Sequence, residues 1–152
     1  MSLAVGDNAP DFTLKDQFGA PITLSGVLTG KAALVVFYPF AFSGICTGEL
    51  CGVRDDLARY QNDAVDFLAI SCDPMPALKA WGEQEGYDFS LLSDFWPHGQ
   101  VARDYGVFHE EAGFAVRGSF LIDQSGVVRW SVVNGPGEAR DFSEAADAIA
   151  AL

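Results

Sequence analysis

The 152-residue sequence has little positive charge, and this narrows the choice of partners. Only 9 lysines and arginines stand against 21 aspartates and glutamates, which gives a formal net charge of −12. A field of this sign repels nucleic acid phosphates and anionic membrane surfaces. The sequence therefore predicts no nucleic acid partner and no membrane partner.

Long apolar segments are also missing. The longest apolar run is interrupted by Pro39 and is shorter than the roughly 18 to 20 residues that a membrane-spanning helix needs. The first residues, Met-Ser-Leu-Ala-Val-Gly-Asp, lack the basic and apolar regions of a secretory signal. We therefore expect a cytoplasmic protein.

Cysteine and histidine are scarce, with three and two residues. An odd number of cysteines in a chain without a signal argues against a structural disulfide framework. No Cys-x-x-Cys pair is present, and both histidines lie far from the cysteines in sequence, so we expect no metal and no cofactor. The cysteines are left with redox chemistry or inert packing.

What the sequence does contain is the composition of a folded protein, with 49% hydrophobic and 20% charged residues. Its length suits one domain, residues 1–152. Alternating and apolar runs predict strands, and apolar residues at helical spacing predict helices. In chain order we expect a hairpin (11–14 with 21–24), a buried strand (32–38), a helix to about residue 61, a strand (65–72), a helix (76–86), a short strand (90–92), a short helix (100–105), a strand pair (117–123 with 127–133) and a closing helix after a capping box of Asp141 and Glu144.

This order predicts an α/β fold. The run at 32–38 is almost wholly apolar, as in a strand that is buried on both faces at the centre of a sheet. Strands that alternate with helices place those helices on the faces of the sheet. We expect a thioredoxin-like sandwich, with a central mixed β-sheet flanked by helices and an N-terminal β-hairpin.

The segment 39–51, Pro-Phe-Ala-Phe-Ser-Gly-Ile-Cys-Thr-Gly-Glu-Leu-Cys, holds the main candidate for chemistry. It places Cys46 where the central strand gives way to a helix start. Unpaired N–H groups and the positive end of the helix dipole favour a thiolate at such a position. On position alone, an inert buried cysteine is an equally good interpretation, because free cysteine is often buried.

Pro39-x-x-x-Ser43-x-x-Cys46 resembles the active-site signature of the peroxiredoxin family, Pro-x-x-x-Thr/Ser-x-x-Cys. The likeness covers nearly the whole chain and is strongest to the AhpE-type alkyl hydroperoxide reductases, through the segments 93–99 and 105–108. Glu49 stands where the family commonly has an acid, and Arg117 stands where the family has its catalytic arginine. The resemblance implies a thioredoxin-like fold and a thiol-dependent peroxidase.

The resemblance also implies a role for each residue of the pattern. Cys46 would be the nucleophile that attacks the peroxide. Ser43, Arg117 and backbone N–H groups near Cys46 would donate to the peroxide oxygens, where negative charge develops. Glu49 would orient Arg117, and Pro39 would keep water from the sulfur.

Each of these residues has a simpler alternative. Ser43 could serve only as an N-cap. Arg117 and Glu49 could form an exposed ion pair of little energetic value. Pro39 could merely end the strand. Cys72, at the end of the strand 65–72, is interpreted as packing.

Cys51 is a candidate resolving cysteine, because a second cysteine five residues after the first resembles peroxiredoxins of the PrxQ type. Residues five apart in an intact helix have Cα atoms roughly 8.6 Å apart. A disulfide needs a separation below about 7 Å, so the helix would have to unwind. Gly48 and Gly52 would lower the cost of unwinding by about 1 kcal/mol each. The alternative is a buried helix cysteine.

The predicted function is the thiol-dependent reduction of hydrogen peroxide and organic hydroperoxides, in which Cys46 passes through a sulfenic acid. The expected partners are a peroxide and a thiol reductant, which could be thioredoxin, a glutaredoxin-like protein or a low-molecular-weight thiol. The family implies a homodimer. Two alternatives are a thioredoxin-like thiol–disulfide oxidoreductase that uses Cys46 and Cys51, and a non-catalytic binding or holdase module.

Overall fold

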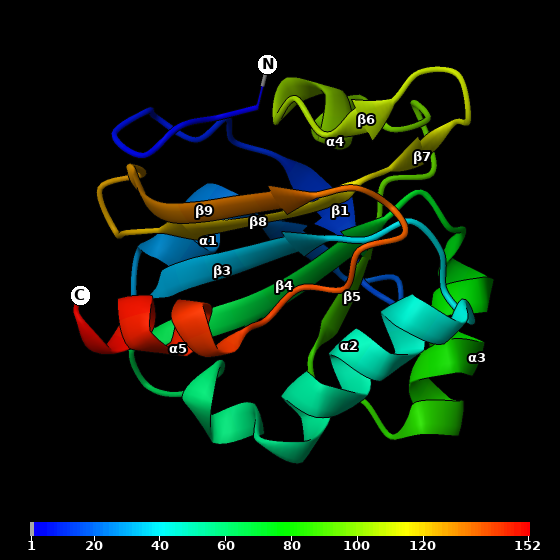
Figure 1. Ribbon diagram of the computed structural model, residues 1–152, viewed down its shortest axis with the longest axis horizontal. Coiled ribbons are helices and arrows are strands. Elements are labelled where there is room, and N and C mark those ends of the chain that lie inside the picture. Colours follow the sequence, from blue (N-terminus) through cyan, green and yellow to red (C-terminus); the bar gives the residue numbers. More distant parts are fainter. Residues whose placement is uncertain (1) are drawn as a thin grey trace.

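A seven-stranded mixed sheet forms the centre of the computed structural model, which describes residues 2–152 (Figure 1). The strand order is β2-β1-β5-β4-β3-β8-β9. The strands are β1 (Thr13–Lys15), β2 (Pro21–Thr23), β3 (Ala32–Phe37), β4 (Val65–Ser71), β5 (Ser90–Ser93), β8 (Arg117–Ile122) and β9 (Val128–Asn134). β3 pairs in parallel with β4 and antiparallel with β8, so the predicted mixed sheet and central strand are confirmed. The predicted N-terminal hairpin is the antiparallel pair of β1 and β2.

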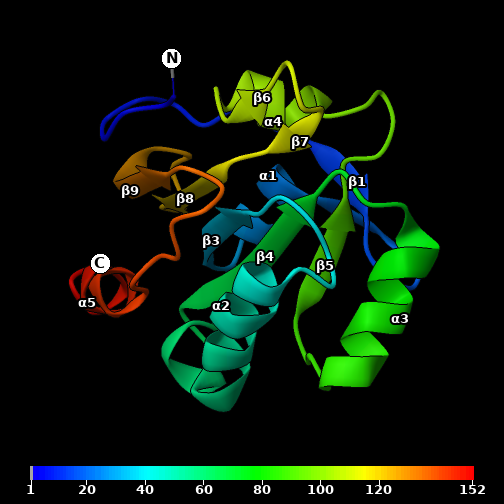
Figure 2. The same ribbon diagram turned by 45° about the vertical axis from the view of Figure 1, so that its right-hand side comes forward.

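Helices cover both faces of this sheet. They are α1 (Leu24–Leu28), α2 (Gly44–Asp55), α3 (Met75–Glu85), α4 (Gln100–Asp104) and α5 (Ser143–Ala150). Because side chains alternate along a strand, Leu34 and Val36 of β3 pack with α2, α3 and α5, whereas Val35 and Phe37 pack with α1 and α4. The helices α2 and α3 lie side by side on one face (Figure 2). None of the helices described in residues 2–152 has the length and hydropathy to cross a membrane.

Two predicted helix boundaries are wrong. The helix expected to reach about residue 61 ends at Asp55, because Asp56 leaves the helical region with φ −135° and ψ 41°, and a 3₁₀ turn (Leu57–Arg59) follows. The expected capping box of Asp141 and Glu144 does not form. Asp141 accepts hydrogen bonds from the N–H and hydroxyl of Ser143, two residues ahead, and α5 begins at Ser143.

Two short elements were not predicted. The five-residue helix α1 follows the hairpin, and a two-stranded pair of β6 (Phe108–His109) and β7 (Phe114–Ala115) precedes β8. Both are too short for a periodic pattern to identify them in the sequence. The pair β6 and β7 leads the chain into β8, which begins at Arg117.

Candidate active site

Cys46 lies in the first turn of α2, after the chain leaves the central strand β3. Ser43 is the N-cap of this helix, and its Oγ accepts a hydrogen bond from the N–H of Cys46 at 3.3 Å. The preceding residue, Phe42, has φ 68°, a conformation that costs energy for any residue with a side chain. Cys46 has no exposed surface in this structure. The thiol therefore sits at the positive end of the helix dipole.

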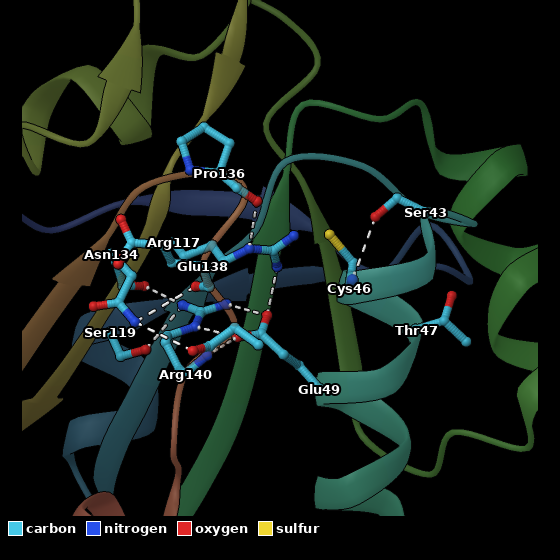
Figure 3. A network of polar contacts seen from close by, with 12 residues as sticks. Ser43, Cys46, Thr47, Glu49, Arg117, Ser119, Asn134, Pro136, Glu138 and Arg140 are labelled. Atoms are coloured by element: carbon cyan, nitrogen blue, oxygen red, sulfur yellow. Dashed lines mark hydrogen bonds and ion pairs between the residues drawn. The ribbon is translucent and has the colours of Figure 1, made fainter.

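Arg117 is buried and is fixed by two hydrogen bonds. Its Nε donates to the carbonyl oxygen of Pro136 at 2.8 Å, and its Nη1 donates to Oε1 of Glu49 at 2.5 Å. Its third nitrogen, Nη2, makes no hydrogen bond to any protein atom within residues 2–152. Figure 3 shows the guanidinium and the Cys46 sulfur pointing toward one another. Two anchored nitrogens thus leave one nitrogen to face the thiol.

Glu49, one turn after Cys46 on α2, accepts from two arginines. Arg140 donates from Nη2 to Oε1 at 2.9 Å and from Nε to Oε2 at 3.0 Å, and its backbone N–H donates to Oε2 at 2.7 Å. The Nη1 of Arg140 donates to the carbonyl oxygen of Gly118 and to Oγ of Ser119. Arg140, from the loop before α5, therefore ties α2 to β8 (Figure 3).

The charges of this buried cluster do not cancel. Burial by itself would raise the pKa of Glu49, but the hydrogen bonds and charge of Arg140 outweigh it, so this pKa lies below its ordinary value. An ionised Glu49 leaves two guanidinium groups against one carboxylate, an excess of one positive charge. The Cys46 sulfur faces this excess charge through Arg117 (Figure 3).

The loop after β9 completes the support of Arg117 by supplying the carbonyl of Pro136. Asn134, the last residue of β9, donates from Nδ2 to the carbonyl oxygens of Glu138 and Ala139, each at 3.4 Å. These bonds close the glycine- and proline-containing loop on itself. The position of the Pro136 carbonyl is thereby linked to the end of the sheet (Figure 3).

The other cysteines lie apart from this cluster. Cys51 is a half-buried free thiol in an unbroken α2, with its sulfur 3.4 Å from the hydroxyl of Tyr87 on the side of α3. Cys72 is free and buried, and burial raises its pKa to about 12, which makes it unreactive near neutral pH. No group of three or more His, Cys, Asp or Glu is placed to hold a metal ion in the described part of the chain.

The structure brings together most of the site residues that the sequence singled out. Cys46, Ser43, Glu49 and Arg117 meet at the start of α2, and Pro39 is buried just before them. The alternative of an exposed ion pair is wrong, because the side chains of Arg117 and Glu49 are each only 2% exposed. The N-cap role of Ser43 is observed, and it leaves the hydroxyl proton available to another acceptor.

Sequence reasoning missed two participants, Arg140 and the carbonyl of Pro136. Arg140 lies in a loop, 91 positions from Glu49 in sequence, and belongs to no recognisable spacing. A backbone carbonyl has no residue-type signal at all. Neither could be found without the path of the loop between β9 and α5.

A mixed sheet with helices on both faces, carrying a helix-start cysteine that faces an anchored arginine, is the arrangement of a thiol enzyme of the thioredoxin-like class. The model of the AhpC/TSA family matches residues 5–131. Over 150 residues the chain is 52% identical to "Alkyl hydroperoxide reductase E" of Mycobacterium tuberculosis, covering 99% of this chain and 98% of the relative. "Peroxiredoxin Bcp" of Escherichia coli is 38% identical over 132 residues, 83% of each chain.

Solved structures agree with these relatives. Peroxidoxin BcpB of Mycobacterium tuberculosis superposes with a TM-score of 0.88 at 30% identity, over 99% of this chain and 98% of that one. AhpC of Enterococcus faecalis gives a TM-score of 0.88 at 28% identity, over 99% of this chain and 92% of that one. The chain belongs to the AhpC/TSA family and is a peroxiredoxin. Membership of this family favours the predicted thiol-dependent peroxidase over the two alternatives, a thiol–disulfide oxidoreductase and a non-catalytic binding module.

Proposed function

We propose that Cys46 is the residue that reduces the peroxide. The observation that supports this proposal is the excess positive charge of the buried cluster of Arg117, Glu49 and Arg140, which lies beside the thiol at the start of α2. In this proposal the excess charge stabilises the Cys46 thiolate. The thiolate sulfur attacks one peroxide oxygen and the O–O bond breaks. Sulfur is oxidised to the sulfenic acid, and the leaving oxygen takes up a proton to depart as water or an alcohol.

The neighbouring groups stabilise the charge that builds on the peroxide oxygens. The Nη2 of Arg117 faces the thiol, and Ser43 can donate its hydroxyl proton while its oxygen still caps α2. Such donors act strongly because they are oriented in advance and shielded from water. Glu49 holds Arg117 in this orientation, and Pro39, which has no N–H, keeps water from the sulfur.

Access of the substrate requires movement of the segment before α2, because Cys46 has no exposed surface. That segment carries the exposed apolar side chains Phe40 and Phe42, and the exposed Ile45 follows in the first turn of α2. An apolar mouth suits organic hydroperoxides as well as hydrogen peroxide, and the name of the mycobacterial relative, alkyl hydroperoxide reductase, supports this substrate class.

The catalytic cycle closes when the sulfenic acid is reduced. In one route Cys51 attacks the Cys46 sulfur, the S–O bond breaks, water leaves, and an intramolecular disulfide forms. In the other route an external thiol attacks directly. The first route requires α2 to unwind, because it is unbroken from Gly44 to Asp55 and keeps Cys46 and Cys51 too far apart for a disulfide.

Peroxiredoxins use a peroxide and a thiol reductant and often form dimers. For this chain we propose a homodimer whose reductant is thioredoxin, a glutaredoxin-like protein or a low-molecular-weight thiol. A cytoplasmic location suits the proposal, because that compartment keeps thiols reduced. All three cysteines are free thiols in this structure.

Stopped-flow tryptophan fluorescence tests the roles of the two cysteines. Trp81 donates from its Nε1 to Oγ1 of Thr47 in α2, so it should report changes near Cys46. Reduced protein is mixed with hydrogen peroxide or a fatty-acid hydroperoxide, alongside Cys46→Ser and Cys51→Ser. We expect a fast phase that only Cys46→Ser abolishes and a second phase that Cys51→Ser abolishes. No phase in any protein with confirmed free thiols would overturn the role of Cys46.

A further inference from the structure

A second polar contact region on α2 faces α3 and is separate from the cluster around Arg117. The hydroxyl of Tyr87 donates to the carbonyl oxygen of Thr47 at 3.4 Å and lies 3.4 Å from Sγ of Cys51. In a helix, that same carbonyl accepts the N–H of Cys51. Tyr87 therefore touches both ends of the helical turn from Thr47 to Cys51.

Further bonds join this turn and its surroundings to α3. The Nε1 of Trp81 donates to Oγ1 of Thr47 at 3.3 Å, and Sγ of Cys51 lies 3.7 Å from a carboxylate oxygen of Glu85. One turn further on, Arg54 donates to the carbonyl oxygen of Glu85 at 2.7 Å. These contacts join the neighbouring helices α2 and α3 (Figure 2).

Tyr87 makes its contact from a rigid position. Its ring stacks on Phe89 at 4.9 Å and meets Trp81 edge-on at 5.0 Å. It directly follows Gly86, which ends α3 with φ 68°, a conformation that glycine adopts without strain. Burial raises the pKa of Tyr87 well above its ordinary value, so the phenol keeps the proton that it donates. A hydroxyl held this firmly restrains the helix that it touches.

The restrained turn is the one that must open if Cys51 is to reach Cys46. The further inference rests on that proposed route. Cys51 points toward α3, whereas the sulfur of Cys46 points toward Arg117. A disulfide between them requires the bond from the Cys51 N–H to the Thr47 carbonyl to break and Cys51 to leave Tyr87.

We propose that Tyr87 is a positioning residue, a latch that holds the Thr47–Cys51 turn folded and so sets how long the Cys46 sulfenic acid lasts before Cys51 reaches it. While the latch is closed, the sulfenic acid stays available to an external thiol. When it opens, the intramolecular disulfide forms. The latch thus divides the oxidised enzyme between its two routes of reduction.

The test uses Tyr87→Phe, which keeps the ring and removes only the hydroxyl. Its matched control is Tyr105→Phe, which removes the hydroxyl that donates to the Pro10 carbonyl oxygen at 2.7 Å. The Tyr105 ring packs on the opposite face of the sheet from Tyr87. All proteins carry Cys72→Ser. After one equivalent of hydrogen peroxide, alkylation at timed intervals and intact-mass analysis separate the sulfenic acid from the disulfide, which is about 2 Da lighter than the dithiol.

We expect Tyr87→Phe to form the sulfenic acid at the wild-type rate and the disulfide about three- to tenfold faster, the factor that loss of one net hydrogen bond gives. The control should change neither rate. A merely structural role would not leave the first step intact while it accelerated the second. A disulfide rate that is unchanged or lower in Tyr87→Phe would overturn the latch.

Hydrogen exchange of the Cys51 amide in the reduced proteins tests the latch without any peroxide chemistry. We expect this amide to exchange about three- to tenfold faster in Tyr87→Phe than in wild type or Tyr105→Phe. Equal exchange in all three would overturn the latch whatever Cys51 does. A third outcome is faster exchange in Tyr87→Phe while wild type forms no disulfide after peroxide treatment. That result would support the restraint of α2 by Tyr87, but it would refute Cys51 as the resolving cysteine and with it the division between two routes.

Discussion

Arg140 binds both carboxylate oxygens of Glu49 with its side chain, through Nη2 at 2.9 Å and Nε at 3.0 Å. Glu49 in turn holds Arg117 through the oxygen that it shares with Arg140. Of these two arginines, Arg117 is the one that turns a nitrogen toward Cys46 (Figure 3). The orientation of Arg117, which faces the Cys46 thiol, thus depends on Arg140, a loop residue that does not face the thiol.

Glu49→Gln should be strongly destabilising, because it leaves two buried guanidinium groups without a compensating charge. Removal of one partner of a buried ion pair costs several kcal/mol, and we expect about 3 kcal/mol from urea unfolding at pH 7. Asp56→Asn, which removes the exposed pair with Arg59, should have a much smaller effect. Equal effects of the two variants would contradict the buried cluster as a unit.

Acid should remove the contribution of Glu49 to stability. Its pKa is lower in the folded state than in the unfolded chain, so the contribution is complete above the ordinary range of a glutamate and is lost as the pH falls through the folded-state value. The stability difference between wild type and Glu49→Gln should therefore shrink on acidification, measured by urea unfolding from pH 7 downward. A difference that stays constant into strong acid would show that Glu49 is not ionised in the fold.

Arg117→Lys should slow the oxidation of Cys46 about 100-fold, the cost of removing one oriented donor from a charge-stabilising site. A lysine keeps the charge but cannot donate to Pro136 and Glu49 while a third nitrogen faces the thiol. The rate of the fast fluorescence phase measures this effect. Arg129→Lys changes an exposed arginine paired with Asp123 and should leave the rate unchanged.

Variants of Ser43 separate its two roles. Ser43→Ala should lower the free energy of unfolding by about 1 kcal/mol through loss of the cap and slow Cys46 oxidation about 100-fold through loss of the donor. Ser43→Thr keeps a hydroxyl and should preserve both properties. If Ser43→Ala lost stability but reacted at the wild-type rate, Ser43 would be an N-cap only.

Asp94 should give the stability an opposite pH dependence. This carboxylate is 2% exposed and accepts from the N–H groups of Val101 and Ala102 at the start of α4. Burial raises its pKa to about 6, against the hydrogen bonds that lower it. The folded state binds the extra proton, so the contribution of Asp94 is complete below the unfolded-state pKa of 3.8 and is lost as the pH rises from there through about 6. The stability of wild type relative to Asp94→Asn should fall over this range by up to about 3 kcal/mol, and a flat difference would contradict the raised pKa.

The sequence predicted most of the sheet because its strands carry strong local patterns. The six residues of β3 are all buried, and the apolar run at 32–38 reflects this directly. The helices α2 and α3 were also predicted in place. Helix ends were less certain, because the exit at Asp56 and the turn at Asp141 depend on local hydrogen bonds and packing that weak propensities do not determine.

The chemical site was predictable only in the part that is contiguous in sequence or matched to a family pattern. Pro39, Ser43, Cys46 and Glu49 lie within one strand-to-helix segment, and Arg117 opens a recognisable strand. Arg140, the Pro136 carbonyl and the contact of Tyr87 with Cys51 come from segments that meet only in the folded chain.

The sequence by itself determined that a thiol lies at the start of a helix, directly after the central strand. Strand and helix periodicities and an N-cap serine are local properties of the sequence. The tertiary structure alone decided what surrounds that thiol. Loop closure places Arg140 on Glu49, and the packing of α3 places Tyr87 on the turn that holds Cys51. Contacts between residues far apart in sequence depend on how helices and loops pack on the sheet, and no spacing along the chain encodes that packing.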